Sequence, residues 1–285
     1  MLSDRRFSVL CTALGLTVGL VYSAAWVKLL IHFSMGGSVF ALLSLASAYL
    51  ALENLWKRRS ELSALPQMSR FQRRLGCSLI LFGTALFVAG YSRLWVQAVG
   101  WAIVLVGLVL CQWGIGFWRS HRRTVLLMGL SIYPGIARVL ETVWNGAIPG
   151  VLERITAQTA TMVLQFGGQS AFVEGVLIHL SNSGVEVSTG CNGLPTMLAI
   201  LWVGLLISCG LRRWHRLMFL GFGIGLAFIF NAVRVAYLTL IAVYGTHESF
   251  EFWHGDWGAQ IFIAPLFLVY YFVGFRSTQA SYKAG

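Results

Sequence analysis

Three polar residues in the second half of the chain have the types needed for acyl-transfer chemistry, and the first is Cys191. It stands in the sequence Gly190-Cys191-Asn192-Gly193, where the two glycines allow a tight turn. Pro195 suits the first turn of a helix, because its missing N–H costs nothing there. A thiol just ahead of a helix N-terminus meets free N–H groups and the positive end of the helix dipole, which favour the nucleophilic thiolate.

A cysteine in an apolar chain can also be only a small hydrophobic residue. That alternative stays open for Cys191, and we adopt it for the other four cysteines. These are Cys11, Cys77, Cys111 and Cys209. No two cysteines form a CxxC pair and no Cys/His set has zinc spacing, so the sequence predicts no disulfide scaffold and no metal site.

The second residue is Arg234, which lies within an apolar segment long enough to cross a membrane. A buried membrane arginine costs a few kcal/mol on insertion scales, and such residues usually face a polar interior and serve function. Asn231 precedes it by three residues and shares its helix face, where it could orient the guanidinium. If the helix ends at Gly245, Arg234 lies about 16 Å from that end. The alternative is a structural arginine paired with a membrane acid such as Glu141.

The third residue is His254, which precedes the last apolar segment in a Trp-rich stretch. Imidazole is the usual general base near neutral pH, and Asp256 is close enough in sequence to influence its charge. Taken alone, a histidine in such a loop need not be catalytic. The prediction that His254 is catalytic depends on its combination with Cys191 and Arg234.

The composition places these residues in a membrane protein. Of the 285 residues, 57% are hydrophobic and 11% are charged, whereas a soluble domain has about 25% charged residues. This difference excludes a soluble enzyme, a nucleic-acid-binding protein and a disordered chain. A transmembrane helix needs about 20 apolar residues, and the fifth candidate is the weakest because Pro134 and Gly135 interrupt it. The eight candidates are 7–31, 35–55, 75–92, 94–117, 124–144, 194–210, 217–245 and 257–274.

The basic residues predict the orientation of these spans. With both termini in the cytoplasm, 16 of the 21 Lys and Arg residues fall in cytoplasmic segments, as the positive-inside rule requires. The acidic residues instead concentrate in or near two outer segments, 145–193 and 245–256. We therefore expect a multi-pass membrane protein with both termini in the cytoplasm.

The first outer segment is too long for a simple connector. Apolar residues at helical spacing predict a helix over 151–164, lying in the interface or packed on the bundle. Two β-branched runs, 176–180 and 185–187, flank an Asn/Ser/Gly turn and predict a β-hairpin. The predicted fold class is an all-α polytopic membrane protein of about eight transmembrane helices, with a small extracytoplasmic helix and a β-hairpin before the sixth span.

This topology places Cys191, Arg234 and His254 in the outer half of one three-helix unit. A cysteine nucleophile needs a base to take its proton, and the tetrahedral intermediate needs a donor such as an arginine for its oxyanion. The combination predicts a membrane cysteine acyltransferase or peptidase that opens outward. The alternatives are a transporter or channel with Arg234 as an intramembrane anion-binding residue, a non-catalytic assembly scaffold, and a redox enzyme, which the lack of paired cysteines disfavours.

Residues 133–272 resemble the exosortase/archaeosortase family. The resemblance rests on a Cys-x-Gly motif at Cys191, an Asn-x-x-Arg motif that ends at Arg234, and a downstream histidine, His254. It implies that these three residues are catalytic and that no metal or organic cofactor is required. The residues that we expect to support them are Asn192, Gly193, Asn231 and Asp256.

Two of these supporting positions depart from the family pattern. Asn192 stands where many members have Ser or Ala, and so marks a subgroup. Asp256 follows His254 by two residues, whereas many members have an acid directly after the histidine. The second departure puts an orienting role of Asp256 in question.

The resemblance also implies the activity and its setting. It implies an integral membrane cysteine protease or transpeptidase of a bacterial or archaeal cytoplasmic membrane, with its active site on the outer face. The implied substrates are secreted or surface proteins with a C-terminal sorting tail, made of a short recognition motif, a hydrophobic helix and a basic cluster. Such sorting is tied to exopolysaccharide and surface assembly. The expected partners are this tail and membrane lipid, with no nucleic acid. We assign residues 1–123 to a scaffold that packs the substrate helix, and residues 124–285 to the catalytic core.

Overall fold

The computed structural model describes residues 2–35, 38–65, 68–181, 183–208 and 211–283, and in these residues the chain is helical apart from one small sheet. It divides into two compact units, 1–135 and 136–285. Seven helices are long and apolar enough to cross a membrane, and α7 and α8 together can supply an eighth span. The predicted polytopic all-α fold is therefore confirmed.

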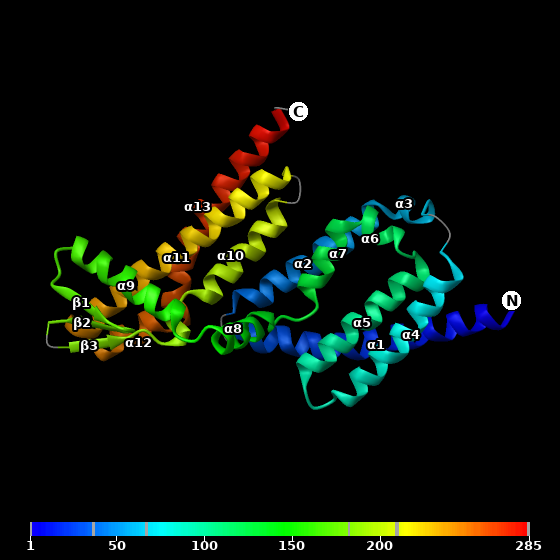
Figure 1. Ribbon diagram of the computed structural model, residues 1–285, viewed down its shortest axis with the longest axis horizontal. Helices are drawn as coiled ribbons and strands as arrows, with labels where there is room; N and C mark the ends of the chain where they lie inside the picture. The colour runs from blue at the N-terminus through cyan, green and yellow to red at the C-terminus, as the bar shows by residue number, and fades with distance from the viewer. Residues whose placement is uncertain (1, 36–37, 66–67, 182, 209–210, 284–285) are drawn as a thin grey trace. The chain divides into compact units, whose positions relative to one another are not determined.

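The first unit holds the N-terminal spans (Figure 1). Its helices are α1 (Leu2–Met35), α2 (Val39–Lys57), α3 (Arg59–Ser63), α4 (Arg70–Ala89), α5 (Leu94–Gln112), α6 (Gly116–Ser120) and α7 (Arg122–Ser131). The backbones of α4 and α5 approach closely at glycines. A Cβ placed on Gly76 would lie 2.8 Å from the carbonyl oxygen of Gly107, and one on Gly83 would lie 2.8 Å from that of Gly100. Small residues of this kind allow close packing of membrane helices.

Three cysteines that are far apart in the sequence meet in this unit. Cys11, Cys77 and Cys111 belong to one buried cluster, and the Sγ atoms of Cys77 and Cys111 are 3.7 Å apart. All three are free thiols. Their burial fits the interpretation of these residues as small hydrophobic side chains. Cys209 lies outside the described residues.

The second unit contains the residues with candidate chemistry. Helices α10, α11 and α13 run side by side, and α9, the sheet and α12 lie at one end of this bundle (Figure 1). Its elements are α8 (Ile136–Ala147), α9 (Val151–Phe166), β1 (Ala171–Glu174), β2 (Leu177–Leu180), β3 (Ser183–Glu186), a 3₁₀ turn (Thr189–Cys191), α10 (Leu194–Ile207), α11 (Arg213–Tyr244), α12 (His247–His254) and α13 (Asp256–Lys283).

The sheet is antiparallel with the order β1-β2-β3. The predicted hairpin corresponds to β2 and β3, whereas β1 was not predicted. Ile178 and Leu180 of β2 are buried and pack with alanines of α9 and with Val235 of α11. The sheet and α9 are therefore packed on the C-terminal half of α11. Of the two arrangements expected for the helix over 151–164, the structure shows the one packed on the bundle.

The fifth predicted span, 124–144, is broken. It forms α7 and α8, which are separated by residues 132–135. Pro134 in this break has no N–H to donate and disfavours a helical conformation in the residue before it. Pro134, one of the residues that made this span the weakest candidate in the sequence, thus explains the break between α7 and α8.

Candidate active site

The thiol of Cys191 and the imidazole of His254 lie together, although 63 residues separate them in the sequence. The Sγ atom is 3.6 Å from Nε2 of His254. Cys191 is half-buried and His254 is exposed, so the pair is open to a substrate. A thiol hydrogen-bonded to an imidazole can pass its proton to that base.

Helix α12 positions the imidazole. Thr246 caps this helix by accepting a hydrogen bond from the N–H of Ser249, at 3.2 Å. His254 is the last residue of the helix, and its ring stacks on Phe250 one turn earlier, with 5.3 Å between ring centroids. The sequence did not predict α12, because eight residues with three charged or titratable side chains in the first turns give little apolar periodicity.

The side chain of Arg234, on α11, contacts the backbone of His254. Its Nη2 donates a 2.9 Å hydrogen bond to the carbonyl oxygen of His254. Its Nε is buried and has no partner among the described residues. No described carboxylate pairs with this guanidinium, so the alternative of an ion pair with Glu141 finds no support.

A small cavity adjoins the guanidinium. Its volume is about 40 Å³, and Arg234, Asn231 and Thr196 supply its polar lining. The remaining lining residues are Phe230, Ala259, Phe262, Ile263 and Leu266. A space of this size with polar groups on one side can hold water or a small part of a ligand.

The backbone of the Cys191 turn is held by Asn231. The Nδ2 atom of Asn231 donates to the carbonyl oxygen of Cys191 at 2.9 Å. The N–H of Cys191 donates to the carbonyl oxygen of Ser188 at 2.9 Å, which closes the 3₁₀ turn. Asn231 thus positions the backbone of Cys191, and not the guanidinium as the sequence suggested.

Asn192 is wholly buried and connects this turn to α9. Its Nδ2 donates to Oε1 of Glu153 at 2.9 Å, and its Oδ1 accepts from the N–H of Leu194 at 3.0 Å. Its carbonyl oxygen accepts from Oγ1 of Thr156 at 3.2 Å. Two residues one helical turn apart on α9 therefore fix the residue next to the thiol.

Sequence reasoning missed Glu153 and Thr156. The one available signal was an acid among apolar residues in a helix expected to be amphipathic. Glu153 is buried, and its second carboxylate oxygen, Oε2, has no partner among the described residues. Glu153 lies in the first turn of α9.

Gly193 permits the close approach of α11 to this turn. Its φ is +81°, in the left-handed region that glycine tolerates. A Cβ at this position would lie 2.7 Å from Cγ of Asn231. The glycine is therefore required both by its backbone conformation and by its neighbour.

Asp256, the last predicted supporting residue, opens α13, but its side chain lies outside the described part of the structure. Among the described residues, no group of three or more His, Cys, Asp and Glu side chains could hold a metal ion.

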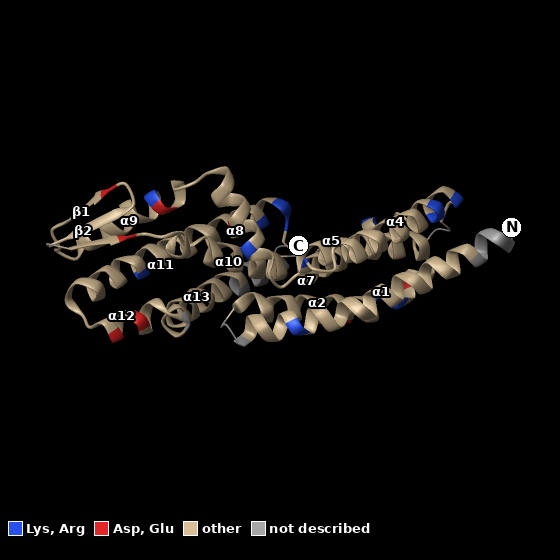
Figure 2. Cartoon of the chain, turned by 90° about the horizontal axis from the view of Figure 1, so that it is seen from below, with Lys and Arg blue, Asp and Glu red and all other residues tan. Residues whose placement is uncertain are grey.

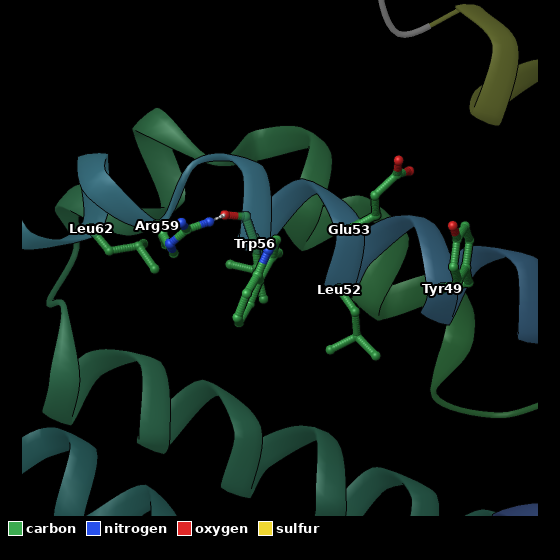
Figure 3. Close-up of a pocket in the computed structure, with 7 residues that line it drawn as sticks. Tyr49, Leu52, Glu53, Trp56, Arg59 and Leu62 are labelled. Carbon is green, nitrogen blue, oxygen red and sulfur yellow. Dashed lines mark hydrogen bonds between the residues drawn. The ribbon is translucent and has the colours of Figure 1, made fainter.

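A second hollow lies in the first unit and has different chemistry. It has a volume of about 630 Å³ and is lined by residues of α2 and α3, which Figure 3 shows as sticks. The guanidinium of Arg59 lies over the Trp56 ring, 4.8 Å from its centroid. The other lining residues are Tyr49, Leu52, Glu53, Leu55 and Leu62. None of them is a nucleophile paired with a base.

A comparison with models of protein families identifies the family of this chain. The family model described as transmembrane exosortase (Exosortase_EpsH) matches residues 26–271. The chain belongs to the transmembrane exosortase family. The match begins within α1, at residue 26, so the similarity to exosortases covers most of the first unit as well as residues 133–271. A search of curated proteins and a search of solved structures found no match to this exosortase family member.

Proposed function

We propose that this exosortase family member is a membrane cysteine protease or transpeptidase that cleaves the C-terminal sorting signal of secreted or surface proteins. The observation that carries the proposal is the 3.6 Å contact between Cys191 Sγ and His254 Nε2. Beside this pair, Arg234 donates a hydrogen bond to the carbonyl oxygen of His254. Family membership alone supports only a membrane sorting role. The thiol, imidazole and guanidinium at one end of the bundle support the chemistry.

In the proposed mechanism, His254 takes the proton of Cys191 and the thiolate attacks the scissile carbonyl. Arg234 donates to the oxyanion of the tetrahedral intermediate, because it has further N–H groups beside the one bonded to His254. The C–N bond then breaks, and the imidazolium returns its proton to the leaving amine. A thioester remains on Cys191, and an amine or water attacks it with His254 again as base.

The proposed location is a bacterial or archaeal cytoplasmic membrane, with both termini inside and the site on the outer face. The distribution of Lys and Arg supports this orientation. The substrate tail would place its hydrophobic helix among the spans and its basic cluster on the cytoplasmic side. Its recognition motif would then reach Cys191, in a sorting process that serves exopolysaccharide or surface assembly.

The test is processing of a tagged protein that carries a candidate motif–helix–basic tail, co-expressed with this chain. We expect the tail to be removed by the wild type and retained with Cys191→Ala, as a mass shift on a gel reports. Cys11→Ala is the matched control, since Cys11 is buried in α1. Normal processing by Cys191→Ala overturns the nucleophile assignment. It would favour the transporter alternative, in which Arg234 binds an anion.

A further inference from the structure

We propose that the free edge of β3 binds the extended substrate segment next to the scissile bond as an added antiparallel or parallel strand. This inference rests on the proposed function, and it names the surface that presents the substrate to Cys191. Pairing with a strand edge recognises an extended peptide mainly through its main chain.

The register of the sheet identifies the groups on the free edge. The N–H of Val187 donates to the carbonyl oxygen of Val176 at 2.9 Å, so Val187 points its main-chain groups toward β2. Hydrogen-bonding groups alternate along an antiparallel strand. Val185 therefore also faces β2, whereas the N–H and C=O of Gly184 and Glu186 point away from it. Among the described residues these outward groups have no partner.

The two edge strands of the sheet, β1 and β3, differ in whether other parts of the chain contact their free main-chain groups. At the β1 edge, Gln165 of α9 donates from Nε2 to the carbonyl oxygen of Ala171 at 2.8 Å. At the β3 edge, Ser183, Gly184 and Glu186 are exposed. Strand β3 also has no proline, lysine or arginine, which commonly protect such edges. The β3 edge therefore offers main-chain groups to an extended peptide, which is how a strand edge binds one.

The free edge leads directly to the nucleophile. Strand β3 ends at Glu186, and Cys191 follows five residues later. Val187 is buried and anchors the connection, whereas Ser188, Thr189 and Gly190 are exposed. A peptide paired with β3 would therefore continue along an accessible path to the thiol. This continuity favours the substrate segment as occupant over a second copy of the chain.

The first test removes one outward N–H and leaves the β2 ladder intact. Glu186→Pro does this, since the Glu186 N–H does not face β2 and proline is tolerated at a strand edge. Glu186→Ala is the matched variant, because both substitutions remove the carboxylate and only proline removes the N–H. Each is combined with Cys191→Ala, and binding of a fluorescent peptide of the tail motif is measured by anisotropy. We expect about tenfold weaker binding for Glu186→Pro than for Glu186→Ala.

The second test examines the peptide in the cleavage reaction of the wild type. N-methylation at successive positions removes one substrate N–H at a time. We expect cleavage to fall at every second position, the period of a paired strand. Unchanged iodoacetamide alkylation of Cys191 in the Glu186→Pro variant confirms that the active site is folded.

These measurements separate the two proposals. Equal affinities of the proline and alanine variants overturn the β3 proposal while cleavage still stands. Binding that depends on the Glu186 N–H without cleavage supports the β3 proposal and overturns the proposed function. A peptide that no variant binds overturns both. A change in oligomeric state in Glu186→Pro, without a change in peptide affinity, assigns the edge to a second copy and overturns the proposal.

Discussion

At the residue scale, the candidate nucleophile is held mainly through its main chain. Asn231 binds the carbonyl of Cys191, and Asn192 binds the first N–H of α10 while its own amide is fixed by Glu153. The thiol itself is half-buried against the hydrophobic cluster of α9 and the sheet, and its Sγ lies 3.6 Å from Nε2 of the exposed His254. This arrangement leaves the sulfur free for a substrate while the turn beneath it is rigid, as a preorganised nucleophile requires.

Gly193→Ala tests this rigidity. A side chain at φ +81° is strained, and its Cβ would meet Asn231 at 2.7 Å. We expect loss of most tail cleavage and destabilisation by roughly 1–3 kcal/mol, measured as processing rate and thermal unfolding in detergent. The matched control is Gly190→Ala, two residues before Asn192, where the nearest atom to a Cβ lies 3.9 Å away. Equal activity of the two variants contradicts the role given to Gly193.

At the element scale, the spans were predictable and the contacts between elements were not. Hydropathy located the membrane helices, since burial in lipid requires about 20 apolar residues in a row. It also located Cys191 at a helix start and Pro195 in the first turn of α10. Strand β1 was missed because four residues with an exposed Glu174 carry too little pattern. The role of Glu153 depends on packing against a residue 39 positions away, which spacing cannot reveal.

Glu153 offers a test of α9 as a positioning element. Glu153→Gln keeps an acceptor for the Asn192 amide, whereas Glu153→Ala leaves that buried amide unsatisfied, at a cost of about 1–3 kcal/mol. We expect Glu153→Gln to retain most cleavage, because Oε2 has no hydrogen-bond partner that an amide would lose. Glu153→Ala is expected to lower kcat at least tenfold with a smaller change in KM.

The variants Glu153→Ala, Asn192→Ala and their combination form a double-mutant cycle. If the two residues act through their mutual hydrogen bond, the effects of Glu153→Ala and Asn192→Ala are not additive. Glu174→Ala serves as the control, since this acid is exposed on β1. Equal losses in Glu153→Gln and Glu153→Ala would show that the charge matters, and would reject a purely positioning role.

At the scale of the whole molecule, charge is distributed unevenly along the spans. Within the second unit, Figure 2 shows acidic residues on the sheet and on α12. The opposite end of α11 begins at Arg213. Its 32 residues extend about 48 Å, longer than the roughly 30 Å hydrocarbon core, so the C-terminal part of α11 can carry Arg234 closer to water than a span of ordinary length would.

Cysteine labelling in intact cells tests the resulting orientation. In a background with Cys191→Ala and Cys209→Ser, the remaining cysteines are buried. We expect a membrane-impermeant maleimide to label Ser183→Cys on β3 in intact cells, and Ser60→Cys on α3 only after permeabilisation. Both positions are exposed, so the difference reports sidedness and not burial. The expectation for Ser60 rests on the positive-inside rule, because basic residues surround this position in the sequence. The reverse pattern would place Cys191 and His254 in the cytoplasm, where a secreted protein that has already crossed the membrane cannot reach them, and the sorting function would fail even with the catalytic geometry intact.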